Sequence, residues 1–199
     1  MPAPKKKISK KASERKWKGK DWFSISAPDW LGGTEIAETP ATDSKVVMGR
    51  VIEVPVSELT KDQSKYYMRL KLKAGKPAGN QVKTRFHTFF CVNEYVMRMG
   101  RKGLGKVTFY EDVETRDKWK LQVSVVIILN RRGNAEIKKK MRALASKIMR
   151  EKARDLEHGD FVKAAMAGVF QMKIKKGGSK IYPVRFCEVI KIETLKTGD

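Results

Sequence analysis

Hydrophobic and polar residues alternate along much of this chain, which is the period of a strand with one buried face. The clearest alternation lies at 66–73, where apolar side chains alternate mainly with cations. A loop rich in Gly and Pro at 75–80 returns the chain into a second alternating run at 82–90. These segments predict a hairpin with one basic face, and 22–25 predicts a short strand before it.

Further strands are indicated by β-branched and apolar runs. The segment 46–54 is rich in β-branched residues and is expected to be a strand, whereas Gly32, Gly33 and Pro40 predict an extended or looped stretch before it. A second hairpin is predicted from 106–114 and 119–129 across the turn 115–118. The run 123–129 is apolar enough for a central strand.

Apolar residues recur at helical spacing in three later segments. They predict helices at 92–102, at 134–157 with Asn134 as its N-cap, and at 160–167. Two final runs, 169–175 and 180–195, flank Gly177 and Gly178 and predict a closing hairpin. This order of elements predicts an α+β fold with a curved or barrel-like antiparallel sheet and two to three helices.

Charge indicates the class of partner. The 199 residues hold 44 Lys and Arg against 22 Asp and Glu, a formal net charge of +22. A phosphate backbone converts such an excess into affinity by releasing counterions. Nucleic acid is therefore the first candidate partner and an anionic membrane the second.

Other features of the composition fit a folded intracellular protein. The hydrophobic content of 41% is enough for a core, and Cys91 and Cys187 have neither disulfide-framework nor zinc-ribbon spacing. No apolar run approaches the roughly 20 residues that span a bilayer, and no secretory signal is visible. We expect a protein of the reducing cytosol without membrane association.

The first 20 residues are predicted to form a disordered basic arm that orders on RNA, and 21–199 a single α+β domain. A solubility tail is the alternative interpretation of the arm. Trp17 lies where no core exists and is the best candidate for stacking on a base. The arm's other candidate RNA-binding residues are Lys5, Lys6, Lys7, Lys10, Lys11, Arg15, Lys16, Lys18 and Lys20.

Two basic segments of the predicted domain extend this RNA surface. The hairpin face is expected to lack acidic partners, and the glycine-rich segment 98–106 lets backbone approach a phosphate but lacks the spacing of a nucleotide-binding loop. Most aromatic residues on strands, including Tyr66 and Tyr67, are expected in the core. The candidates here are Arg50, Arg69, Lys71, Lys73, Lys83, Arg85, Arg98, Arg101, Lys102 and Lys106.

Residues for catalysis are few. His87 and His158 lie near no recognisable triad or metal spacing, so a structural or RNA-contacting role is expected. The acidic residues Glu111, Asp112 and Glu114 are expected to pair with neighbouring cations, although they could hold Mg²⁺ in a nuclease. The sequence therefore predicts no enzyme, no cofactor and no metal site.

Six motifs follow one another along the chain: WFSISAP at 22–28, EIAETPA at 35–41, GRVIE at 49–53, ELTKD at 58–62, KIYPVR at 180–185 and EVIKIE at 188–193. In this order they resemble the archaeal and eukaryotic small-subunit ribosomal protein family S-three-a-e, also called eukaryote-type S-one. The resemblance extends from about residue 16 to 195. Ala37 stands where the family usually has Gly, and 116–119 lacks the usual Asp-Gly-aromatic turn, which leaves the local loop geometry open.

The resemblance implies a structural protein without enzymatic activity that binds small-subunit ribosomal RNA on the platform near the messenger exit. Its expected partners are that RNA, neighbouring ribosomal proteins and messenger RNA near the exit, in the cytoplasm. The chain length suits an archaeal member. Two alternatives remain from the residues themselves: a non-ribosomal single-strand RNA-binding module, and a metal-dependent RNA-processing enzyme that uses Asp112 or Glu114.

Overall fold

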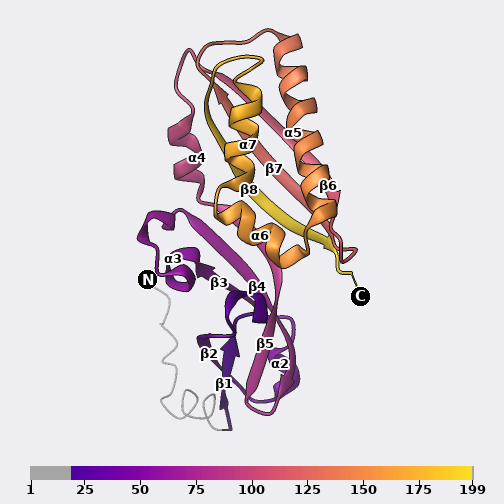
Figure 1. Ribbon diagram of the computed structural model, residues 1–199. Helices are drawn as coiled ribbons and strands as arrows, with labels where there is room; N and C mark the ends of the chain where they lie inside the picture. Colours follow the sequence, from indigo (N-terminus) through magenta and orange to yellow (C-terminus); the bar gives the residue numbers. More distant parts are fainter. Residues whose placement is uncertain (1–18, 199) are drawn as a thin grey trace, which may run out of the picture.

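A computed structural model describes residues 19–198 as an eight-stranded sheet with helices on its faces (Figure 1), which confirms the α+β class. The strands are β1 (Asp21–Ser26), β2 (Glu35–Ala41), β3 (Val51–Pro55), β4 (Met68–Ala78), β5 (Gln81–Cys91), β6 (Gly105–Glu114), β7 (Lys120–Leu129) and β8 (Val184–Lys196). The helices are α2 (Ser44–Val47), α3 (Val56–Thr60), α4 (Asn93–Met99), α5 (Ala135–Asp155), α6 (His158–Met166) and α7 (Val169–Gly178), with 3-10 turns at Asp29–Leu31 and Gln63–Lys65. None of these helices is long and apolar enough to cross a membrane.

The sheet is open rather than closed into a barrel. Its main order is β2-β1-β5-β8-β7-β6, with β4 beside β5 and β3 beside β4. The β1–β5 pair is parallel and all other pairs are antiparallel, so the sheet is mixed. Six α-helices lie within residues 19–198, rather than the two to three that the sequence predicted.

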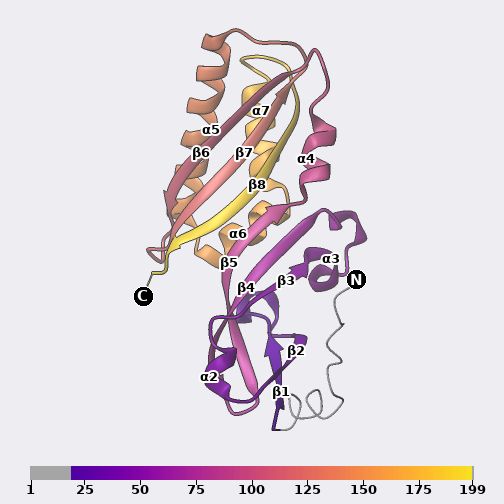
Figure 2. The ribbon, with the colours of Figure 1, turned by 180° about the vertical axis from the view of Figure 1, so that it is seen from behind.

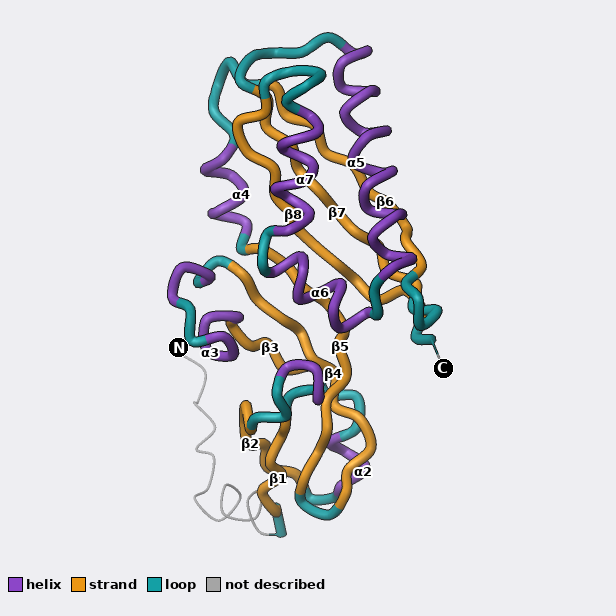
Figure 3. Tube along the Cα trace, in the orientation of Figure 1, coloured by secondary structure: helices purple, strands orange, loops and turns teal. Residues whose placement is uncertain are grey.

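Strand β5 joins the two parts of the sheet. One edge of β5 pairs with β4, while its other edge pairs with β1 near its start and with β8 near its end. The β5–β8 pairing is short and comprises Thr88–Phe90 against Lys191–Glu193. Figure 3 shows β5 running between the lower group of strands and the layer formed by β6, β7 and β8.

Strand β4 confirms the predicted alternation, whereas in β5 the alternation breaks at His87, after which Phe89 rather than Phe90 is buried. Met68, Leu70 and Leu72 are buried, whereas Arg69 and Lys73 point to solvent. A bulge near His87 shifts the register, because Leu72 pairs with Phe86 while Lys71 pairs with Thr88. The apolar positions therefore cover the core and leave the cations on the outer face.

The apolar strand β7 is central, as its sequence predicts. Val125 and Ile127 belong to the main core beneath α5, α6 and α7, whereas Val126 and Ile128 pack in a second cluster with residues of α4. Figures 1 and 2 show α5 and α7 on one face of the β6–β8 layer. Both faces of β7 are thus buried, which explains why its sequence runs almost without polar residues.

The predicted closing hairpin is wrong in its first half, since 169–178 forms helix α7. Phe170, Met172 and Ile174 alternate with polar residues, a period that fits a strand. Phe170 and Ile174 are also four residues apart and share one helical face, and both are fully buried, whereas Met172 is 70% exposed. Burial therefore follows the helical period and not the strand period.

The predicted strand at 46–54 is shorter than expected. Residues Ser44–Val47 form α2, and the chain turns at Gly49 with a φ of 82° before β3 starts at Val51. Val47 is buried in a small core with Phe23, Ile25 and Val82. Upstream, Glu35–Ala41 pairs with β1 as a strand, with one register shift between Ile25 and Ser26. Of the two predictions for that stretch, extended or looped, the extended one is therefore correct for 35–41.

We expect Phe170→Ala to lower the free energy of unfolding by about 3–5 kcal/mol, because it removes a fully buried ring. Met172→Ala is the matched control on the same helix and should change the free energy of unfolding by less than about 0.5 kcal/mol. Urea denaturation followed by circular dichroism measures both values. Equal losses would show that 169–178 does not use the helical face described above.

Candidate nucleic-acid interface

A basic groove lies where the β4–β5 hairpin meets the end of β8. Its volume is about 730 Å³, and the cations that line it are Lys73, Lys76, Arg85 and Lys196, together with His87. No Asp or Glu from the described part of the chain lines this basic groove. Lys73 and Arg85 are directly opposite each other in the β4–β5 register. Because like charges at paired positions repel, an anion between them would relieve that repulsion.

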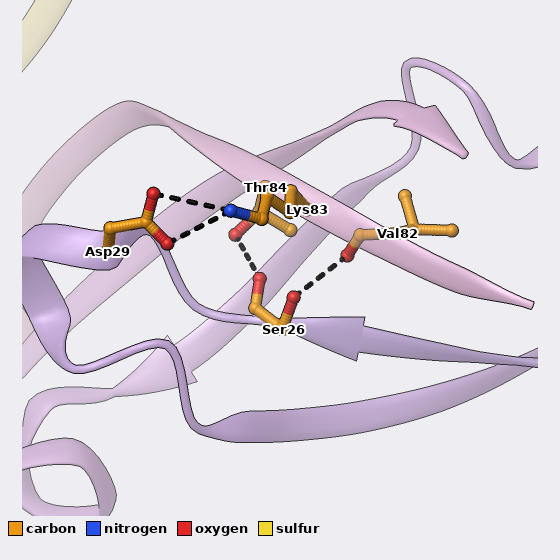
Figure 4. Close-up of polar contacts among 5 residues, drawn as sticks. All are labelled: Ser26, Asp29, Val82, Lys83 and Thr84. Atoms are coloured by element: carbon orange, nitrogen blue, oxygen red, sulfur yellow. Dashed lines mark hydrogen bonds and ion pairs between the residues drawn. The ribbon is translucent and has the colours of Figure 1, made fainter. Parts of the chain in front are cut away.

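Two cations of the predicted hairpin face have acidic partners, so the expectation that this face lacks them is wrong. Arg69 Nη1 lies 2.7 Å from Glu53 Oε1 on the neighbouring strand β3. Lys83 Nζ lies 3.2 Å from Asp29 Oδ1 (Figure 4), and both side chains are exposed. Exposed ion pairs contribute only about 0–1 kcal/mol, so a phosphate could replace either carboxylate.

The same region of β5 is fixed to β1 by two hydroxyl groups. Thr84 Oγ1 donates to the Ser26 carbonyl oxygen at 2.8 Å, and Ser26 Oγ donates to the Val82 carbonyl oxygen at 3.4 Å (Figure 4). These bonds hold the parallel pair together where it is only three residues long. The backbone beneath Lys83 and Arg85 is therefore held in place.

Arg50 has an internal structural role. Its Nε donates to the Val46 carbonyl oxygen at 3.2 Å, and its Nη1 donates to the Pro40 carbonyl oxygen at 3.3 Å and to the hydroxyl of Thr39. The side chain is half-buried. Arg50 thus ties β2 to α2 and offers less of its charge to RNA than the sequence suggested.

The glycine-rich segment after α4 contributes to a second concave site. Arg98 and Arg101, together with Arg185 of β8, line a pocket of about 240 Å³ that also contains Tyr66, Tyr95, Met99 and Phe186. We call this site the aromatic pocket. Lys102 and Lys106 are exposed beside it in the chain but do not line it. Gly103 has a φ of 90°, a left-handed conformation that favours glycine.

Sequence reasoning missed several of the residues in these two sites. Lys76, Lys196 and Arg185 are single cations whose positions depend on contacts distant in sequence. Tyr66 was expected in the core because it continues the apolar alternation of β4, yet it precedes the strand and is 60% exposed. Among the remaining predicted RNA contacts, Lys20 is half-buried just before β1. Lys71 Nζ lies 4.9 Å from the centroid of the Phe90 ring. The other candidates in the arm lie outside the described residues.

Two of the three acidic candidates, Glu111 and Asp112, have local partners. Glu111 pairs with Arg150 of α5, and Asp112 accepts a hydrogen bond from Gln122 Nε2 at 3.1 Å. Neighbouring strand residues point to opposite faces, so Glu111 and Asp112 are poorly placed to share a cation. Within residues 19–198 no three His, Cys, Asp or Glu side chains form a group that could hold a metal ion.

His158 connects α6 to the turn between β6 and β7. Its ring bonds to the Asp117 carboxylate and stacks on Trp119, with centroids 4.1 Å apart. Burial raises the pKa of Asp117, but hydrogen bonds from Thr115 and His158 outweigh it and hold that pKa below its ordinary value. These contacts support a structural role for His158.

Burial disfavours the ionised forms of two thiols and one carboxyl group. Burial raises the pKa of both the Cys91 and the Cys187 thiol to about 12, so both remain protonated at neutral pH. Burial also raises the pKa of Glu188, against the effect of a hydrogen bond from Gln171. Glu188 lies on β8 two residues after Phe186 of the aromatic pocket.

Comparison with known proteins decides the family. The model of the Ribosomal S3Ae family matches residues 8–198. The chain belongs to the ribosomal S3Ae family. Among its relatives named small ribosomal subunit protein eS1, the one from Archaeoglobus fulgidus is 37% identical over 182 residues, which are 90% of this chain and 86% of that protein. The relative from Pyrobaculum islandicum is 33% identical over 90% of this chain and 81% of its own length. The relative from Methanococcus vannielii is 30% identical over 95% of this chain and 86% of its own length.

Membership of the ribosomal S3Ae family confirms the resemblance seen in the sequence motifs. It also fits a concave site that four cations line and to whose lining residues 19–198 contribute no Asp or Glu. The match extends through both the basic groove and the aromatic pocket, since residues 8–198 include every residue that lines them.

We expect Glu188→Gln to raise stability at pH 7.5 and to leave it nearly unchanged below pH 4. The pKa of Glu188 is higher in the folded state than in the unfolded state. The contribution of the Glu188 carboxyl group to stability is therefore fully present below the unfolded-state pKa and is lost as pH rises through the folded-state pKa. Gln keeps a neutral side chain at every pH. Urea midpoints at the two pH values measure the difference, and an equal effect at both would contradict burial as the cause.

Proposed function

We propose that this protein is a structural constituent of the small ribosomal subunit that binds ribosomal RNA through phosphate contacts. The basic groove is the observation that supports this most, because four cations converge there from two strands and the end of a third. Membership of the ribosomal S3Ae family and the net charge of +22 point in the same direction. The role requires no catalytic group.

The mechanism is neutralisation of a shaped phosphate surface. Paired strands hold Lys73 and Arg85 at fixed positions, so the groove presents its charges before RNA binds. Fixed cations on a sheet favour the backbone of a folded RNA, whose sequence is hidden in a deep and narrow major groove. Phosphate contacts position such a protein without reading bases.

The family resemblance supports a proposal for the place of this protein in the particle. We propose the platform of the small subunit, near the messenger exit and the 3′ end of the small-subunit RNA, in the cytoplasm. Neighbouring ribosomal proteins and messenger RNA near the exit are the further partners. The basic residues of the arm, 1–20, would extend the phosphate contacts beyond the sheet.

A salt titration tests the phosphate mechanism. We expect binding of the full chain to small-subunit RNA to weaken steeply as salt rises, because each phosphate contact contributes about 0.7–0.9 to the log–log slope. Replacing Lys73, Lys76 and Arg85 with Gln should make that slope shallower by about 2 to 3. Filter binding at several salt concentrations measures it.

The matched control replaces three cations that already have acidic partners. Lys140, Lys147 and Lys163 pair with Glu136, Glu151 and Asp160 on helical surfaces, and their change to Gln removes the same formal charge. We expect this control to alter the slope much less than the groove variant. A flat slope for the unaltered chain, or equal changes in both variants, would refute the proposed role of the groove.

A further inference from the structure

The aromatic pocket is built from three parts of the chain that meet beside α4. Tyr66 precedes β4, Tyr95 and Arg98 come from α4, and Phe186 comes from β8. Figure 2 shows α4 alongside β8 at this edge of the sheet. The volume of about 240 Å³ is below the roughly 300–1,000 Å³ of pockets for drug-sized ligands, which favours a small flat group.

The rings of this pocket are held in place before any ligand binds. Tyr67 stacks on Tyr95 with centroids 3.7 Å apart, and Tyr66 meets Tyr67 at 5.7 Å with the two planes at 82°. Tyr66 is nevertheless 60% exposed and Phe186 is 45% exposed. Each exposed ring offers a flat apolar surface whose burial against another ring would be favourable.

Charge around these rings favours an anionic ligand. Arg98, Arg101 and Arg185 are exposed, and none of them forms an ion pair with any described residue. No Asp or Glu of residues 19–198 lines the pocket. The Arg185 guanidinium lies 5.5 Å from the centroid of the Phe186 ring, so cation and ring already act as one surface. Arginine binds phosphate by two parallel hydrogen bonds and also stacks on planar groups.

We propose that the aromatic pocket binds one unpaired nucleotide of an RNA strand. The base stacks on an exposed ring, Tyr66 or Phe186, while the arginines hold the adjoining phosphates. A base inside a duplex has both faces covered by its neighbours, so only an unstacked base can offer a face to an aromatic side chain. This inference rests on the proposed function but adds a site for single-stranded RNA beside the phosphate surface.

Fluorescence of a base analogue tests the stacking. A seven-nucleotide unpaired RNA with one 2-aminopurine is titrated with the full chain, and stacking quenches its fluorescence. The double variant Tyr66→Ala with Phe186→Ala should lose the quenching and bind about fivefold to a hundredfold more weakly. Tyr66→Phe retains the ring and should behave like the unaltered chain.

Tyr110→Ala is the matched control. Tyr110 is 68% exposed on β6 and does not line the pocket, so its removal should change neither quenching nor affinity. Arg98→Gln with Arg185→Gln should weaken binding and reduce the salt dependence, because these cations are assigned to phosphate.

The inference would be overturned by quenching that survives in the double alanine variant, by equal losses with Tyr110→Ala, or by equal binding of the same label within a duplex. An acidic peptide that displaces the RNA and binds the double alanine variant unchanged would assign the arginines to a protein partner and would also refute the nucleotide site.

Salt-dependent binding to folded small-subunit RNA distinguishes a failure of the nucleotide site from a failure of the proposed function. If that binding persists, only the nucleotide site is wrong; if the unaltered chain binds no small-subunit RNA, the proposed function fails.

Discussion

The short antiparallel pairing of Thr88–Phe90 with Lys191–Glu193 joins the two parts of the sheet. The basic groove depends on this junction, since it takes Lys73, Lys76 and Arg85 from the hairpin and Lys196 from the end of β8. The aromatic pocket likewise combines Tyr66 from before β4 with residues of α4 and β8. Neither site would exist on the hairpin or on the β6–β8 layer alone. This pairing, together with a main core that runs through both parts, brings the residues of both concave sites together.

The cations of this surface differ in their surroundings. Some have carboxylate partners, as Arg69 has Glu53, and contribute mainly to the local surface of the protein. Others line the basic groove, where four cations converge and no Asp or Glu of residues 19–198 is part of the lining. A net charge of +22 becomes useful for recognition only where cations are held in fixed positions and face the same way.

Much of the fold could be predicted from local pattern, because alternate burial follows directly from the pleat of a strand. This reasoning found β4 to β7 and the long helix α5, but it misassigned α7, whose residues satisfy both the strand and the helix period. The parallel β1–β5 pair and the position of β8 between β5 and β7 depend on contacts distant in sequence. Lys73 and Arg85 could be proposed as RNA contacts because they lie in the alternating pattern of the hairpin. Lys76, Arg185 and Lys196 could not, because their positions depend on contacts distant in sequence. Arg50 was predicted as an RNA contact but is bonded to β2 and α2.

An electron cryomicroscopy map of the small subunit containing this chain tests the phosphate-binding role of the sheet most directly. We expect RNA phosphates within hydrogen-bonding distance of Lys73, Lys76 and Arg85, along the line where β8 meets the hairpin. Open solvent in front of these three side chains, in a map that resolves the rest of the sheet, would contradict it.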